Sequence, residues 1–295
     1  MILVTGASGT VGGAVAGRLA AAGFPLRLIA RDPRRIAVGG PGVEAAGADF
    51  SDPAALARAF QGAERAFIAT NDPLRPEQDE NLLAAAARAG VKHVVRLSAL
   101  TVTDADADDL ITRWHRDCER RLEASGLLWT FVRPRSFMSN TLGWARSLVD
   151  GVVRAPFGSA RVACVDPRDV AEVAVRALTE PGHEGRAYSV TGPAAISSAE
   201  QAQQLAETLG RRLRFEEISV DEAHRDLARR YPRPVADALA QHLCRRGANA
   251  KCQVERTVEL VTGRPAACFR TWARDHAAAF RLTPVSQSEP VPEGS

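Results

Sequence analysis

Aromatic residues are scarce in this chain, and only two of its 295 residues are tyrosines, Tyr188 and Tyr231. The five cysteines form no CxxC pair, which argues against a zinc site and against a disulfide framework. The sequence has no run of about 18 apolar residues, and no basic segment precedes an apolar one. We therefore expect a cytoplasmic protein with no metal site that does not bind a membrane.

A strong charge of one sign is also missing. The formal net charge is +3, from 38 Lys and Arg against 35 Asp and Glu, and the basic residues are spread along the chain. Nucleic-acid-binding domains usually concentrate basic residues on one face, so nucleic acid is not expected as a partner. With 45% apolar residues, the chain can bury the core of one large domain or of two smaller ones.

The sequence begins with a short apolar run that leads into a glycine-rich turn. Residues 2–4 suit a strand buried on both faces, and residues 13–23 have the composition of a helix. Glycines at 6, 9 and 12 allow a tight turn, close approach to a pyrophosphate and close packing of helix on strand. The first N–H groups of the helix then favour phosphate. The residues expected to bind a dinucleotide are Gly6, Ala7, Ser8, Gly9, Thr10, Val11 and Gly12. A plain glycine-rich turn is the alternative.

Strands and helices alternate through the first half of the chain. Apolar runs typical of strands occupy 2–4, 24–31, 42–50, 64–70, 91–100 and 127–134, with helical patterns at 52–60, 77–90 and 109–126. This alternation predicts an α/β fold, a Rossmann-like doubly wound parallel sheet with a smaller interleaved α/β subdomain. Ligands in such sheets bind at the carboxyl ends of the strands. The side chains expected at that edge are Asp49, Phe50, Thr70, Asn71 and Ser98.

No linker rich in proline, glycine or serine divides the chain. We expect an NAD(P)-binding domain at 1–134 and a mainly substrate-binding subdomain at 135–282, of which 160–192 returns to the sheet. Residues 283–295 lack apolar periodicity and are expected to be disordered.

The end of the second strand bears on the choice of cofactor. An acid at that position favours NAD by binding the ribose 2′-hydroxyl, whereas an arginine favours the 2′-phosphate of NADP. Arg31 holds the position, and Asp32 precedes Pro33, as a helix N-cap does. We therefore expect NADPH to be preferred over NADH, with Arg31 contacting the 2′-phosphate. Arg31 as a solvated surface charge is the alternative.

The segment "TGASGTVG" resembles the TGxxGxxG motif of the short-chain dehydrogenase/reductase superfamily. Residues 113–140, 165–174 and 257–280 resemble its atypical NmrA-like branch, and the likeness covers about residues 1 to 282. That branch includes triphenylmethane and quinone reductases, and a nitrogen regulator that binds dinucleotides without turnover. The resemblance implies that Asp49 and Phe50 contact adenine and that Thr70 and Ser98 flank the ribose and nicotinamide.

Most members of the superfamily use a tyrosine and a lysine, spaced YxxxK, to protonate the substrate carbonyl. Extended members place a glutamate four residues later, and aligning it with Glu119 puts His115 at the lysine position and Ile111 at the tyrosine position. Hydride transfer to a simple ketone makes a basic alkoxide that needs a proton donor, whereas a conjugated acceptor makes a stabilised anion that needs one much less. The absence of the tyrosine therefore favours a conjugated, aromatic or quinonoid substrate.

Ser98 and His115 are the candidate catalytic residues. Ser98 could bind the substrate oxygen or the nicotinamide amide, or only cap its strand; His115 could donate a proton or contact the ribose, or only pair with Glu119. Phe137, Met138 and Trp144 are candidates for the substrate wall, with ordinary core packing as the alternative.

The sequence therefore predicts an NADPH-dependent reductase of a small aromatic or polyketide-like carbonyl compound, as a monomer or a homodimer. The alternatives are a non-catalytic NAD(P)-sensing regulator or scaffold, and an isomerase or epimerase that keeps its cofactor bound. The missing tyrosine favours the regulator and argues against the isomerase.

Overall fold

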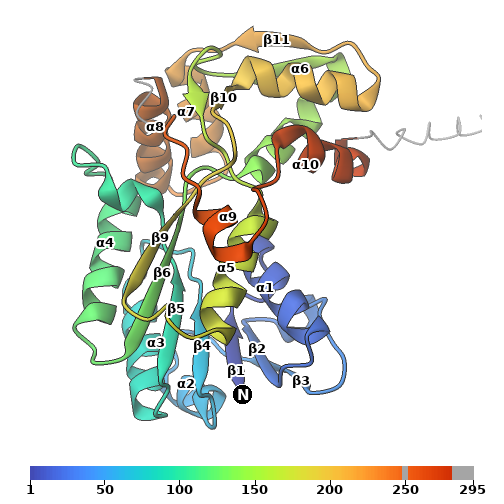
Figure 1. Ribbon diagram of the computed structural model, residues 1–295. Helices are drawn as coiled ribbons and strands as arrows, with labels where there is room; N and C mark the ends of the chain where they lie inside the picture. The colour runs from blue at the N-terminus through green and yellow to red at the C-terminus, as the bar shows by residue number, and fades with distance from the viewer. Residues whose placement is uncertain (248–251, 281–295) are drawn as a thin grey trace, which may run out of the picture.

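Seven parallel strands form the central sheet, in the order β3-β2-β1-β4-β5-β6-β9 (Figure 1). The computed structural model describes residues 1–247 and 252–280. The strands are β1 (Ile2–Thr5), β2 (Leu26–Ala30), β3 (Val43–Gly47), β4 (Arg65–Ile68), β5 (His93–Leu97), β6 (Leu128–Pro134) and β9 (Arg186–Val190). The order of addition reverses between β1 and β4, and sheets of this kind bind their ligands at such a switch point.

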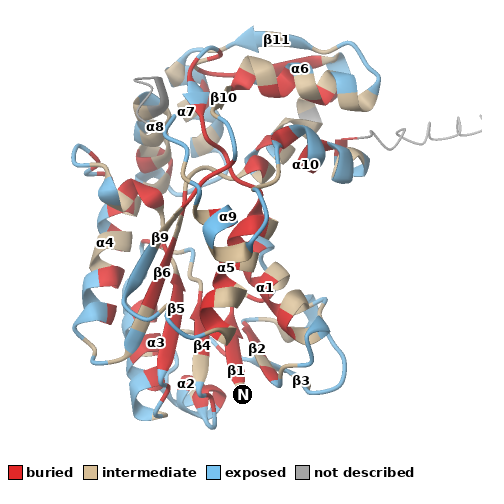
Figure 2. Ribbon diagram, viewed as in Figure 1, coloured by how far each residue is buried: buried red, intermediate tan, exposed pale blue. Residues whose placement is uncertain are grey.

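Helices cover both faces of the sheet, which leaves most of its strands buried (Figure 2). One face is covered by α1 (Thr10–Ala21), α5 (Pro167–Thr179) and α9 (Thr257–Thr262). The opposite face is covered by α2 (Pro53–Phe60), α3 (Glu77–Arg88) and α4 (Leu110–Glu123). Two short 3-10 turns, η1 (Pro33–Arg35) and η2 (Leu100–Thr103), follow β2 and β5.

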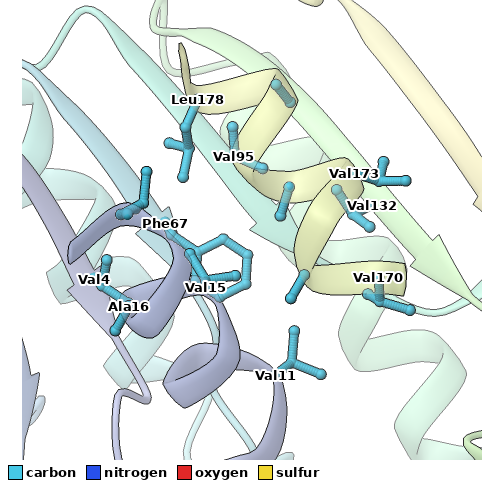
Figure 3. Close-up of a cluster of buried hydrophobic side chains, with 14 of the residues drawn as sticks. Val4, Val11, Val15, Ala16, Phe67, Val95, Val132, Val170, Val173 and Leu178 are labelled. Atoms are coloured by element: carbon cyan, nitrogen blue, oxygen red, sulfur yellow. The ribbon is translucent and has the colours of Figure 1, made fainter. Parts of the chain in front are cut away.

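The cluster between α1, α5 and the sheet fixes the position of the glycine turn. Val11 and Val15 of α1 meet Phe67 of β4 and Val170 of α5 in one apolar cluster, shown in Figure 3. Phe67, Val15 and Val170 have no exposed surface, and Val11 is nearly buried. Because these side chains lie within the first turns of α1 and α5, their packing holds the start of α1 against the sheet.

The chain leaves the sheet after β6 and builds a smaller subdomain beside the carboxyl ends of the strands (Figure 1). Its helices are η3 (Met138–Asp150), α6 (Ser198–Leu209), α7 (Val220–Ala228), α8 (Arg233–Gly247), α10 (Phe269–Asp275) and η4 (Ala277–Phe280). Its strands are β7 (Val152–Ala155), β8 (Arg161–Val162), β10 (Ile196–Ser197) and β11 (Arg214–Glu217). Fully buried Trp272, Leu205 and Leu148 lie in its own apolar core.

The expected fold class, a Rossmann-like parallel sheet with an interleaved smaller subdomain, is confirmed. Local side chains cap two of the helices: Asp52 caps α2, and Ser197 with Glu200 forms a capping box on α6. The expected disordered tail at 283–295 lies outside the described residues.

Candidate active site

Backbone packs closely on backbone in the turn between β1 and α1. Gly6 has a φ of +63°, and its carbonyl accepts a hydrogen bond from the N–H of Gly9 at 2.8 Å. A Cβ on Gly12 would lie 2.3 Å from the Gly6 carbonyl oxygen. The Thr5 hydroxyl accepts a hydrogen bond from the N–H of Ala69 at 2.8 Å and so ties the turn to the end of β4. Close packing of backbone on backbone therefore requires glycine at position 12.

The N-terminus of α1 suits a phosphate group. Its N-cap, Gly9, has no side chain to accept the first N–H groups, and no acidic residue occupies the first turn. These N–H groups and the helix dipole are left for an external anion. The residues present fit the pyrophosphate of a pyridine dinucleotide, which Thr10, Val11 and Gly12 would hold through their backbone. When bound, that cofactor supplies a hydride.

Two acidic side chains at the ends of β2 and β3 are already used as local caps. Asp32 accepts hydrogen bonds from the Arg34 side chain at 2.9 Å and from its backbone N–H at 3.1 Å, and these bonds lower the pKa of Asp32. Asp49 accepts the backbone N–H of Ser51 at 2.8 Å, which lowers the pKa of Asp49. Arg31 is exposed at the end of β2 and forms no ion pair with any described residue. The expected role of Asp32 as a cap is confirmed.

The other residues expected to contact the cofactor lie along the same edge of the sheet. The half-buried Phe50 follows β3, and its carbonyl accepts a hydrogen bond from the Asn81 side chain at 3.0 Å. Asn71 is exposed directly after β4. In the glycine turn, Ala7 is buried and Ser8 is exposed.

A buried charged network supports this edge and was not anticipated from the sequence. Asp79 and Arg96, each 1% exposed, form an ion pair at 2.7 Å. Asp79 also accepts hydrogen bonds from the Thr70 hydroxyl at 2.8 Å and from the Trp114 indole at 2.9 Å. The network joins α3, β5 and α4 to the end of β4. The signal in the sequence is a lone arginine inside the apolar strand 91–100.

The two candidate catalytic residues differ in their surroundings. Ser98, at the end of β5, is 4% exposed, and its hydroxyl has no hydrogen-bond partner in the described part of the chain. His115 is half-buried and its Nδ1 likewise has no partner there. Burial, and then the charge of Arg96, lower the pKa of His115 to about 3. At neutral pH the imidazole is therefore uncharged, which argues against His115 as the proton donor.

The alternative pairing of His115 with Glu119 is wrong. Glu119 instead accepts two hydrogen bonds from Arg133 of β6, at 2.9 and 2.6 Å, and so links α4 to the next strand. Ile111, at the position that the superfamily's tyrosine would hold, is half-buried in the first turn of α4.

Neither of the two tyrosines lies on α4. Tyr188 lies on β9, where its hydroxyl oxygen is 2.7 Å from Nδ1 of His183. Tyr231 follows α7 and lines a cavity in the smaller subdomain.

That cavity, of about 790 Å³, lies between η3, α7 and α8 and opens next to the end of β6. Phe137 and Trp144 line it, as does His242 of α8. Met138, expected beside them, is 2% exposed and packs in the subdomain core, so it is not part of the wall. The other apolar side chains on the wall include Ile218, Leu227, Leu239 and Leu243. No sequence motif marks Leu227 of α7 or Leu239 and Leu243 of α8.

Among residues 1–247 and 252–280, no group of three or more His, Cys, Asp or Glu could hold a metal ion. No helix within those ranges is long and apolar enough to span a membrane.

The chain matches known reductases over nearly its whole length. The profile of a family described as NAD(P)H-binding matches residues 6–181. A (4-alkanoyl-5-oxo-2,5-dihydrofuran-3-yl)methyl phosphate reductase of Streptomyces griseus is 56% identical over 281 residues, covering 95% of this chain and 99% of that protein. An NAD(P)H azoreductase of Xenophilus azovorans is 38% identical over 286 residues, covering 95% of this chain and 99% of that protein.

A solved structure shares the whole architecture. The NADPH complex of an NADPH-dependent quinone oxidoreductase from Escherichia coli has a TM-score of 0.82 and 28% identity, covering 94% of this chain and all of that one. The glycine turn, the sheet and these relatives agree that the protein is an NAD(P)H-dependent oxidoreductase. The chain belongs to the NAD(P)H-binding, NmrA-like family of atypical short-chain dehydrogenases/reductases.

Proposed function

We propose that this protein is an NADPH-dependent reductase of a conjugated lactone, a 4-alkanoyl-5-oxo-2,5-dihydrofuran that carries a phosphorylated hydroxymethyl group. The observation that carries the proposal is the 56% identity, over almost the full length of both chains, to a reductase named for that compound. The missing tyrosine supports it independently, because the chemistry of this compound reduces the need for such an acid.

The ring double bond of such a lactone is conjugated with two carbonyl groups, the ring carbonyl and the alkanoyl carbonyl. Adding a hydride to the ring carbon that bears the hydroxymethyl phosphate breaks the double bond and leaves the electron pair on the neighbouring carbon. Both carbonyl oxygens share that negative charge, so the anion is weakly basic and can take its proton from water or from a weak donor. A half-buried Ile111 in place of tyrosine is compatible with this reaction.

The chain's own residues would bind and orient the reactants. The Ser98 hydroxyl, buried without a partner in the described part of the chain, can donate to a carbonyl oxygen of the lactone or to the nicotinamide amide. Phe137 and Trp144 would bound the ring, and the smaller subdomain would shield it from water. Arg31 would bind the 2′-phosphate, the feature that favours NADPH over NADH.

The experiment is to incubate the purified protein with NADPH and either the synthetic lactone phosphate or a panel of quinones, and to follow the absorbance of the reduced cofactor. We expect the lactone phosphate to be the better substrate by kcat/KM, and NMR of the product to show a saturated ring with both carbonyls intact. Turnover of quinones alone would contradict the proposed substrate. Binding of NADPH with no turnover of any acceptor would instead favour the sensor.

A further inference from the structure

The substrate cavity has four basic or acidic side chains on its wall, and all but one of them are paired. The four are Arg154, Asp226, Arg230 and His242. Arg154 pairs with Asp150 at 2.9 Å and with Glu216 at 3.4 Å; Asp226 pairs with Arg229 at 2.9 Å; His242 pairs with Asp109 at 3.0 Å. Arg230 forms no ion pair and no side-chain hydrogen bond with any described residue. The wall therefore presents one unneutralised guanidinium.

The position of Arg230 directs this charge across the cavity. Arg230 lies just past the end of α7, and its Nη1 would be 3.8 Å from a Cβ placed on Gly143 of η3. Because Gly143 has no side chain, the guanidinium has room beside η3. Trp144, the next residue of η3, lines the same cavity. The cation and an aromatic side chain that suits a planar ring therefore line the same cavity.

The rest of the cavity suits the remainder of an acylated lactone phosphate. Leu227, Leu239 and Leu243 give it an apolar side that would bind an alkyl chain. Ser198, also on the wall, is fully buried, and its hydroxyl has no hydrogen-bond partner among the described residues. A buried hydroxyl without a partner is costly, and a polar ligand atom would satisfy it.

We propose that Arg230 binds the phosphate group of the substrate and makes the enzyme selective for the phosphorylated lactone over the free alcohol. The proposal rests on the proposed function and assigns its phosphate to one residue. A guanidinium matches a phosphate through two parallel N–H···O bonds, and the exposed position of Arg230 lets the dianion stay partly hydrated. No covalent step is involved.

The test compares two compounds, the lactone phosphate and the corresponding hydroxymethyl lactone, in three proteins. Arg230→Met removes the charge and keeps an unbranched apolar side chain of about the length of the arginine's methylene stem. Arg225→Met is the matched control, because Arg225 is an exposed arginine of α7, five residues before Arg230, that does not line the cavity. We expect Arg230→Met to lower kcat/KM for the phosphate about 10- to 100-fold, mainly through KM, and to leave the hydroxymethyl compound unchanged. Arg225→Met should leave both unchanged.

An equal effect of Arg230→Met on both compounds, or no effect on either, would overturn the proposal. Calorimetric binding of the lactone phosphate to the NADP⁺-loaded protein provides a readout that needs no turnover. If the unaltered protein reduces neither compound, the proposed function fails, but the calorimetric measurement still tests the role of Arg230. A loss of affinity for the lactone phosphate of about tenfold or more in Arg230→Met supports that role, and an equal affinity in the two proteins refutes it.

Discussion

Asp109 and His242 lie 3.0 Å apart, carboxylate oxygen to imidazole Nε2, and join the start of α4 to α8, two elements far apart in the sequence. Asp109 caps α4, is 1% exposed, and also accepts the N–H of Thr112 at 3.0 Å and a hydrogen bond from Arg245. Burial alone raises the pKa of Asp109, but the hydrogen bonds from His242 and Thr112 outweigh it and hold this pKa well below its usual range. This one carboxylate therefore fastens α8, and with it a wall of the cavity, to the sheet domain.

Replacing Asp109 with Asn should lower the free energy of unfolding by about 2–4 kcal/mol, because it leaves the guanidinium of Arg245 partly buried without its anion. Urea unfolding measures the loss. KM for the substrate should rise as well, since α8 lines the cavity. The control is Asp108→Asn, because that side chain is 79% exposed and pairs with Arg113 in solvent. Its effect should stay within about 0.5 kcal/mol. Equal losses in the two variants would show that Asp109 does not hold α8.

The half of the fold that binds the cofactor could be predicted because its local signals agree with one another. Apolar strands, the glycine turn and caps such as Asp32 each report local geometry, and all of them favour the same parallel sheet. The position of Arg31 follows from the end of one strand. None of these inferences needs a contact between distant parts of the chain.

Phe137 and Trp144 of the cavity wall were candidates from the sequence, but the side of the wall formed by α7 and α8 could not be predicted, because it is made by contacts between distant segments. Arg230 directly follows one ordinary amphipathic helix and His242 lies on the next, and only the packing of α7 and α8 against η3 brings them to one cavity. Met138 was expected on the cavity wall because it is a large apolar residue beside the site, but its side chain packs in the core of the smaller subdomain. His115 was a candidate acid by its position, and burial removes its charge.

Gly12→Ala should abolish measurable NADPH binding or weaken it by at least about tenfold. The new Cβ would lie 2.3 Å from the Gly6 carbonyl oxygen, so the start of α1 must move away from the position that would hold the pyrophosphate. Gly17→Ala, in the same helix, is the control, because its Cβ would meet only a Val38 methyl at 3.9 Å. That variant should keep its affinity and gain about 0.5–1 kcal/mol of stability. Calorimetry measures the affinity for NADPH, and thermal unfolding measures the stability. Unchanged NADPH binding in Gly12→Ala would refute the assignment of this turn as the pyrophosphate site.

Arg31→Ala should weaken the binding of NADPH by about 1.5–3 kcal/mol and change the binding of NADH much less, because only NADPH carries the 2′-phosphate. Asp32 does not replace the arginine as a ribose ligand, since its carboxylate is bonded to Arg34. Arg58→Ala is the charge-matched control: this exposed arginine lies in the last turn of α2, away from the end of β2. Dissociation constants from fluorescence titration test the prediction. If the affinities for both cofactors fall equally, Arg31 does not bind the 2′-phosphate.

His115 should make the fold sensitive to mild acid. Its pKa in the folded protein is about 3, below the value of about 6.5 for an unfolded chain. Above pH 6.5 the ring is neutral in both states, and its contribution to stability is fully present. Between pH 6.5 and 3 the unfolded chain binds a proton that the folded protein excludes, so stability falls with pH, by at most about 1.4 kcal/mol per pH unit. Below pH 3 the loss from this group is complete.

His115→Asn removes the titrating group, so the free energy of unfolding should fall less steeply between pH 6.5 and pH 3 in this variant. We expect the difference in unfolding free energy between pH 7.5 and pH 5 to be smaller in the variant by up to about 2 kcal/mol, as measured by urea unfolding at each pH. At pH 7.5 the variant should keep NADPH-dependent turnover, because a neutral imidazole supplies no acidic proton there. If the free energy of unfolding fell equally with pH in the two proteins, His115 would take up its proton in the folded state as it does in the unfolded chain. If the variant lost turnover but still bound NADPH, His115 would instead take part in catalysis.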